Sequence, residues 1–272
     1  MNNMKISLIV TTYNWKEALA RCLESTFDQT RLPHEIIVAD DGSREDTAEL
    51  VRAYIKKSPV PLVHVWQPDK GFRAAAARNR GIVASSGDYI IVVDGDVLLD
   101  RRFCEDHQRS AAKGRWIQGS RVLIWQKRSK AILENGLCRL GPFSWGISNR
   151  KNAIRSRLLA MSIRGARDPL KGVRSCNMSF WRDDAFKVNG FNEAFVGWGR
   201  EDSEFVVRLA HAGVERKNLK YLALVFHLYH PENSRKSLPR NDRILQESIS
   251  SKIIRCENGL AGNHDPILLR AG

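Results

Sequence analysis

The chain has 272 residues, 43% of them hydrophobic, and carries a formal net charge of +14 at pH 7. Such a composition is typical of a globular protein with a sizeable core, and no apolar run approaches the roughly 20 residues needed to cross a bilayer. The five cysteines are scattered without a Cys-x-x-Cys pair, which argues against a disulfide framework or a zinc cluster, whereas the charge favours polyanionic partners.

The first hundred residues alternate between strand and helix patterns. The first strand begins at once, without the apolar region of a signal peptide, so we expect a cytoplasmic protein. Four apolar, β-branched runs of strand length are separated by helix-forming segments. With right-handed crossovers, this alternation predicts an α/β fold with a mostly parallel central sheet and helices on both faces. The predicted strands cover residues 6–10, 35–39, 62–66 and 90–93.

Polar side chains follow three of these strands. Because the carboxyl ends of parallel strands meet at one edge of a sheet, we expect these groups to lie together, with two arginines near the start of the third helix. Such an edge suits a nucleotide and a hard divalent cation, although an isolated Asp-x-Asp is more often part of a solvated turn. The side chains concerned are Thr11, Tyr13, Asp41, Arg73, Arg78, Asp94 and Asp96.

The middle of the chain is less regular and strongly basic. We expect a helix within residues 101–113, a strand over 118–124 and an amphipathic helix over 152–163. Between residues 150 and 174 eight basic side chains accompany one acid, which indicates either a solvated helix or a contact with a polyanion or a membrane surface. The charged residues are Arg150, Lys151, Arg155, Arg157, Arg164, Arg167, Asp168, Lys171 and Arg174.

The last third contains an acidic pair and two histidines. We expect strands over 175–180 and 221–225 and helices over 182–188 and 204–211. Glu201 and Asp202 precede the second helix, where an acidic pair is also an ordinary helix start. His227 and His230 follow the last strand, and imidazole is a suitable Mn²⁺ ligand beside a carboxylate, although a lone histidine there is more often structural.

Four motifs of the first hundred residues resemble, in order and spacing, those of family 2 nucleotide-sugar glycosyltransferases of the GT-A fold. They are Val10-Thr11-Thr12-Tyr13-Asn14, Val38-Ala39-Asp40-Asp41-Gly42-Ser43, Gly71 with Ala77-Arg78-Asn79-Arg80-Gly81, and Val93-Asp94-Gly95-Asp96. The resemblance implies that Thr11, Tyr13 and Asp41 contact the uracil or ribose of a UDP-sugar. It also implies that Arg78 contacts the diphosphate or sugar, that Asp94 contacts the ribose or sugar, and that Asp96 binds Mn²⁺ or Mg²⁺. Arg73 is expected from its position near a helix start to neutralise phosphates together with Arg78.

A later motif resembles a second group of glycosyltransferases. Gly197-Trp198-Gly199-x-Glu201-Asp202 is similar to the Gly-Trp-Gly-x-Glu-Asp motif of β-1,4-galactosyltransferases and chondroitin-type polymerases. The resemblance implies that Asp202 is the catalytic base and that Glu201 binds the acceptor, and we expect Trp198, Gly199 and Asn177 in the same acceptor site. It further implies a metal-ligating histidine, for which His227 matches better than His230.

The resemblance predicts an inverting, metal-dependent enzyme that transfers sugar from a UDP-sugar to a hydroxyl of a bacterial surface glycan or glycolipid, such as lipopolysaccharide core, O-antigen or capsule. We expect one continuous GT-A domain with a nucleotide-sugar-binding half at 1–99 and an acceptor-binding half at 100–272. An anionic acceptor, peripheral contact with the inner membrane and no nucleic acid are the expected partners. The alternatives are a sugar nucleotidyltransferase and a basic polyanion-binding protein without catalysis.

Overall fold

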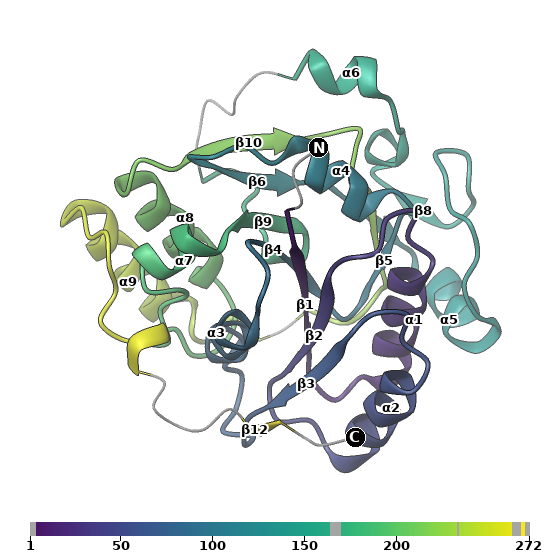
Figure 1. Ribbon diagram of the computed structural model, residues 1–272, viewed down its shortest axis with the longest axis horizontal. Helices are drawn as coiled ribbons and strands as arrows, with labels where there is room; N and C mark the ends of the chain where they lie inside the picture. The colour runs from purple at the N-terminus through teal and green to yellow at the C-terminus, as the bar shows by residue number, and fades with distance from the viewer. Residues whose placement is uncertain (1–3, 164–169, 233, 263–267, 270–272) are drawn as a thin grey trace.

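The computed structural model describes residues 4–163, 170–232, 234–262 and 268–269 (Figure 1). These residues form an eight-stranded sheet with the order β10-β6-β9-β4-β1-β2-β3-β12 and a four-stranded sheet with the order β5-β11-β7-β8.

The first four strands are parallel neighbours and confirm the predicted alternation. Every residue of the first two is buried, which explains why their sequences lack a polar alternation. The elements of this part are β1 (Ile6–Thr12), α1 (Lys16–Phe27), β2 (Glu35–Asp40), α2 (Glu45–Ile55), β3 (Leu62–Trp66), α3 (Ala74–Ala84) and β4 (Tyr89–Asp94).

The chain after residue 100 extends the same sheet. β9 (Met178–Trp181) is antiparallel to β4 and to β6 (Arg115–Gly119), and β10 (Glu215–Leu219) is parallel to β6. Consequently β6 and β10 run in the same direction as β4. The carboxyl ends of all three strands lie on one edge of the sheet.

The smaller sheet joins distant segments next to that edge. It contains β5 (Val97–Leu99), β7 (Arg121–Ile124), β8 (Ile147–Ser148) and β11 (Val225–His227). In the antiparallel pair of β5 and β11, His227 lies opposite Val97, the residue after Asp96. The register of this pair therefore determines which histidine comes close to the Asp-x-Asp motif.

Helices cover both faces of the large sheet (Figure 1). One core contains apolar side chains of α1, α2 and α4 (Phe103–Ser110). The other contains side chains of α3, α7 (Arg182–Lys187) and α8 (Glu201–His211). The arrangement is the three-layer α/β architecture expected from the sequence. The remaining elements are α4 (Phe103–Ser110), α5 (Gln126–Asn135), α6 (Arg157–Met161), α7 (Arg182–Lys187), α8 (Glu201–His211), α9 (Leu238–Ser250), β12 (Leu268–Leu269) and 3₁₀ turns at Arg150–Ala153, Ser175–Asn177 and Leu260–Gly262.

Several predicted boundaries were wrong. The strand expected at 118–124 is interrupted at Ser120 and contributes β6 and β7 to different sheets. The helix expected at 152–163 is limited to α6 after a 3₁₀ turn, and the strand expected at 175–180 begins with another 3₁₀ turn. Left-handed backbone at Tyr221 and Ala223 prevents the strand expected at 221–225, so β11 begins at Val225.

Within the described ranges, no helix combines the length and hydropathy needed to cross a membrane.

Candidate active site

Arg78 joins the end of the fourth strand to the acidic pair of α8. Its Nη2 lies 3.3 Å from Oδ1 of Asp94, and its Nη1 donates to Oε1 of Glu201 at 3.1 Å. Burial would lower the pKa of this guanidinium, but the charges of Asp94 and Glu201 raise it above its usual value. A permanently charged arginine thus neutralises carboxylates from two distant parts of the chain.

Asp202 lies in the first turn of α8. Three of the four turn positions 197–200, Gly197, Gly199 and Arg200, have positive φ angles of 78°, 104° and 79°, and this backbone leads the chain into the helix. Burial and the neighbouring charge of Glu201 raise the pKa of Asp202 to about 7. A carboxyl group with a pKa near neutrality can both accept and release a proton at physiological pH.

A carboxylate and two imidazoles gather beside the strand end. Nε2 of His227 lies 3.5 Å from Oδ1 of Asp96, and Nε2 of His230 lies 3.3 Å from Oδ2. The potential ligand atoms of the three residues all lie within 4.8 Å of one another. Oδ1 of Asp96 is buried without a hydrogen-bond partner among the described residues, and burial lowers the pKa of His227 and keeps its lone pair available. These donors fit a divalent cation such as Mn²⁺, and the structure adds His230 to the residues expected from the sequence.

Thr11 and Tyr13 reach the same edge from the first strand. Thr11 pairs with Asp94 in the register of β1 and β4, and its Oγ1 is buried without a hydrogen-bond partner in the described part of the chain. The ring of Tyr13 is 48% exposed, and its hydroxyl donates to Asp69 at 2.9 Å. The accessible ring can flank a planar ligand.

Asp41 is more deeply placed than Tyr13. It is 3% exposed, and its carboxylate accepts from the Nε2 of Gln67 and, at 2.7 Å, from the backbone N–H of Arg73. Burial raises the pKa of Asp41 to about 6, against the effect of these hydrogen bonds. The guanidinium of Arg73 donates to the carbonyl of Pro68. Asp41 therefore fixes the loop between β3 and α3, and no sequence pattern identified Gln67 as its partner.

Asn177 does not lie where an acceptor could reach it, contrary to the expectation from the sequence. It is 1% exposed, and its Nδ2 donates to the carbonyls of Ser120 and Ala223 at 2.9 Å. Its Oδ1 lies 3.0 Å from Nε2 of His107. Both ends of the amide are bonded within the protein, so Asn177 joins three chain segments.

Trp198 and Gly199 lie in the turn before α8. The indole of Trp198 is 39% exposed, with the Arg235 guanidinium 5.7 Å from the ring centroid. The carbonyl of Gly199 accepts from Nδ2 of Asn241 at 2.8 Å, which ties this turn to α9. The turn thus holds a partly exposed aromatic ring next to the acidic pair.

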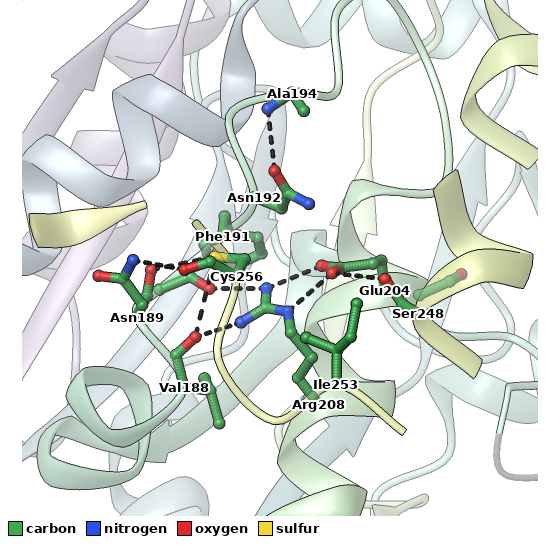
Figure 2. Close-up of polar contacts among 12 residues, drawn as sticks. Val188, Asn189, Phe191, Asn192, Ala194, Glu204, Arg208, Ser248, Ile253 and Cys256 are labelled. Atoms are coloured by element: carbon green, nitrogen blue, oxygen red, sulfur yellow. Dashed lines mark hydrogen bonds and ion pairs between the residues drawn. The ribbon is translucent and has the colours of Figure 1, made fainter. Parts of the chain in front are cut away.

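A buried ion pair anchors α8 behind the acidic pair (Figure 2). Arg208 and Glu204 are 0% exposed and lie 2.7 Å apart, and Arg208 also donates to the carbonyls of Val188 and Gly190. Glu204 accepts from Ser248 of α9 at 3.1 Å. Because all these charges and carbonyls are paired, they fix α8 against α9 and the preceding loop.

The basic segment 150–174 is partly neutralised by acids of α4 and its amino-terminal flank. Arg155 donates to Asp106, whose side chain is 1% exposed, and lies 3.7 Å from Asp100. Arg157 lies 3.6 Å from Glu105. These two arginines therefore contribute to packing as well as to surface charge. Arg164, Arg167 and Asp168 lie outside the described residues.

The three-layer fold has the GT-A architecture found in glycosyltransferases. A family model described as glycosyl transferase family 2 matches residues 7–174, and one described as the N-terminal domain of galactosyltransferase matches residues 155–231. The chain belongs to glycosyl transferase family 2.

Characterised relatives and solved structures agree with this assignment. The chain is 25% identical to a chondroitin synthase of Escherichia coli over 92% of its length and 28% identical to a validoxylamine A glucosyltransferase of Streptomyces hygroscopicus over 77%. It spans 38% and 48% of these two relatives. Staphylococcus aureus TarS 1–349 with UDP matches with a TM-score of 0.62 at 16% identity, covering 95% of this chain and 68% of that one. The Pyrobaculum calidifontis mannosyltransferase PcManGT, in complex with GDP-mannose and Mn²⁺, matches with a TM-score of 0.59 at 18% sequence identity. This match covers 95% of the present chain and 66% of PcManGT.

Proposed function

We propose that this protein is an inverting, metal-dependent glycosyltransferase that moves a sugar from a UDP-sugar to a hydroxyl of a bacterial surface glycan or glycolipid. The observation that carries the proposal is the link from Asp94 through Arg78 to Glu201, beside the cluster of Asp96 and two histidines. This link brings the sheet edge that we propose binds the nucleotide close to Asp202, the candidate catalytic base.

In this proposal Asp202 takes the proton of the acceptor hydroxyl. The acceptor oxygen forms a bond to the anomeric carbon while the bond from that carbon to the diphosphate breaks on the opposite face, so an α-linked donor gives a β-linked product. The raised pKa of Asp202 supports proton acceptance near neutral pH. Glu201, Trp198 and Gly199 orient the acceptor.

The donor is held by the edge that follows the parallel strands. Thr11, Tyr13 and Asp41 contact the nucleoside, and Asp94 contacts the ribose or sugar. The diphosphate is bound by the two arginines, Arg73 and Arg78. Asp96 and His227, joined by His230, hold Mn²⁺ or Mg²⁺, which stabilises the negative charge of the departing diphosphate when bound. Solved structures of similar fold hold UDP in one case and GDP-mannose with Mn²⁺ in another, which supports a nucleotide-sugar donor and a divalent cation.

We also propose a division of labour within one continuous domain. Residues 1–99 form the nucleotide-sugar-binding half, and residues 100–272 form the acceptor-binding half. Strands β6, β9 and β10 support the single domain because they continue the sheet begun by β1 to β4.

Nucleotide binding and product analysis test the function. UDP with Mn²⁺ should raise the melting temperature, GDP should do so less, and a screen of UDP-sugars against lipopolysaccharide core, O-antigen and capsule acceptors should yield a β-linked product. Release of pyrophosphate from UTP and a sugar phosphate would instead identify a nucleotidyltransferase. Tight binding of polyanions without any nucleotide effect would identify a non-catalytic protein.

A peripheral membrane contact is a second proposal and rests on α6. Leu158 and Met161 are 81% and 84% exposed, and the exposed Arg150 and Lys151 precede this helix. Apolar and basic side chains together bind anionic membrane surfaces. Changing Leu158 and Met161 to Asp should reduce cosedimentation with anionic vesicles but not with neutral ones, and unchanged cosedimentation would contradict the proposal.

A further inference from the structure

A polar cavity lies away from the donor groups, at the carboxyl ends of β6 and β10. Its volume is about 340 Å³, and basic and amide side chains predominate in its lining. Among the described residues no Asp or Glu lines it, whereas Arg121, Arg174, Arg216 and Lys220 do. The cavity therefore gathers several positively charged side chains on one lining.

The basic groups are available to a ligand. In the described part of the chain, the side chains of Arg121 and Arg174 form no ion pair or hydrogen bond, and Lys220 contacts only the ring of Tyr221, 5.1 Å from its centroid. Oγ of Ser120, which also lines the cavity, is buried without a hydrogen-bond partner among the residues described. Unpaired arginine, lysine and hydroxyl donors are the groups that bind phosphate or carboxylate oxygens.

Two amide side chains of the cavity lining, the buried Gln118 and the partly buried Asn152, bond to neighbouring segments. Gln118 is 4% exposed, and its Oε1 accepts from the backbone N–H of Arg174 at 2.9 Å, while its Nε2 donates to the carbonyl of Arg174 at 3.1 Å. Asn152 donates to the carbonyl of Arg121 at 2.8 Å. Thus the backbone positions of the two arginines are fixed by other segments, and the cavity is a built site rather than a chance gathering of surface side chains.

The cavity lies on the edge that carries the proposed reaction. β6 is separated from β4 only by β9, so its end is about 10 Å from the end of β4 at the usual strand spacing. Arg121 is the register partner of Val225, two residues before His227 on the same strand. That separation suits a group one or two sugar residues away from the hydroxyl that reacts.

We propose that this cavity binds an anionic group, a phosphate or a carboxylate, carried by the acceptor. The link to the acceptor rests on the proposed glycosyl transfer, whereas the affinity of the cavity for anions does not. The proposal explains why basic side chains gather beyond the reach of the donor diphosphate, which Arg78 and the metal cluster already serve.

Anion titration tests the cavity directly. Inorganic phosphate and glucuronate are titrated separately into the protein saturated with UDP and Mn²⁺, so that the donor site is filled. The double variant Arg174→Gln, Lys220→Gln should bind the preferred anion roughly tenfold or more weakly than the unaltered protein, with UDP affinity unchanged. Tighter binding of phosphate would indicate a phosphorylated acceptor, and tighter binding of glucuronate would indicate an acceptor with a carboxylate.

Strand β6 offers a matched control. Arg115, at its amino end, is exposed and lies on the opposite edge of the sheet, 3.5 Å from Glu215. Arg115→Gln should leave anion binding unchanged. Equal anion affinity in the double variant and the unaltered protein, or an equal loss in Arg115→Gln, would overturn the proposal. If UDP does not bind, the proposed function fails, and the same titration without nucleotide still decides whether the cavity binds anions.

Discussion

Arg78 and Glu201 are 123 positions apart in the sequence, and Nη1 of the arginine donates to Oε1 of the glutamate at 3.1 Å. The same guanidinium contacts Asp94, so one planar group meets two carboxylates at fixed angles. Arg78→Lys keeps the charge but cannot reproduce both contacts. We expect kcat/KM to fall roughly tenfold or more and the melting temperature to decrease. Unchanged kinetics would show that charge alone is needed at this position.

Asp202 is expected to control the chemical step. Asp202→Asn keeps the size of the side chain but removes its basic oxygen, so kcat should fall by roughly 10² or more. The affinity for UDP, measured by calorimetry, should stay nearly unchanged because the proposed nucleotide contacts lie at the ends of the parallel strands. The neighbouring change Glu201→Gln serves as a comparison and should raise the acceptor KM. Equal losses of UDP binding and turnover in Asp202→Asn would indicate a structural role.

The pH dependence of kcat/KM should follow the same carboxyl group. Burial and the charge of Glu201 raise the pKa of Asp202 to about 7. Since only the ionised form accepts a proton, activity should rise with pH up to about 7 and fall as the pH decreases below it. Measurements at saturating Mn²⁺ separate this effect from loss of the metal. If the residual activity of Asp202→Asn still falls below pH 7 in the same way, a group other than Asp202 causes that decrease.

Metal removal should abolish transfer. Excess EDTA is expected to stop product formation, and added Mn²⁺ should restore it. Because Asp96, His227 and His230 can each offer one ligand atom, Asp96→Ala should remove Mn²⁺-dependent UDP binding, and each His→Ala change should weaken Mn²⁺ binding by roughly 10- to 100-fold. Normal Mn²⁺ affinity in His230→Ala would leave His227 as the sole imidazole ligand. Full activity in EDTA would contradict the metal requirement altogether.

Arg155 and Arg157 provide a matched pair for stability. Arg155 pairs with the buried Asp106, whereas Arg157 is half exposed and lies 3.6 Å from Glu105. Arg155→Gln should lower the free energy of unfolding by about 2 kcal/mol or more, because it leaves a buried carboxylate without its partner. Arg157→Gln should change it by less than about 1 kcal/mol. Urea denaturation at pH 7 measures both, and similar small changes would show that Asp106 does not depend on Arg155.

The first four strands were predictable because each is a short, apolar, β-branched run between helix-forming segments. Local sequence patterns do not reveal, however, which strands pair with one another. The strand expected at 118–124 is divided at Ser120 between two sheets, and β9 lies antiparallel between β4 and β6, an arrangement decided by long-range pairing. Tyr221 and Ala223 have left-handed backbone without being glycine, so the late start of β11 has no sequence signal.

The candidate site likewise has residues that the sequence identifies and residues that only the three-dimensional packing reveals. Carboxylates and arginines at strand ends could be identified from the predicted topology and the family motifs. The sequence favours His227 over His230 as the metal ligand. In the structure, the register of β5 and β11 and the turn after β11 bring both imidazoles close to Asp96. Asn177 is expected in the acceptor site, but its amide is buried and bonded to His107, 70 residues earlier in the chain. Such partners are chosen by packing, which a linear sequence does not display.

The anchoring of α8 has a consequence for synthesis on the ribosome. Glu204 depends on Ser248, and Asn189 donates to the backbone of Cys256, so the helix that carries Glu201 and Asp202 is fastened by residues translated near the end of the described chain. The strands with the proposed donor contacts come from the first 96 residues. A growing chain can therefore contain all the strands of the proposed donor edge before the residues that fasten the acidic pair have been translated.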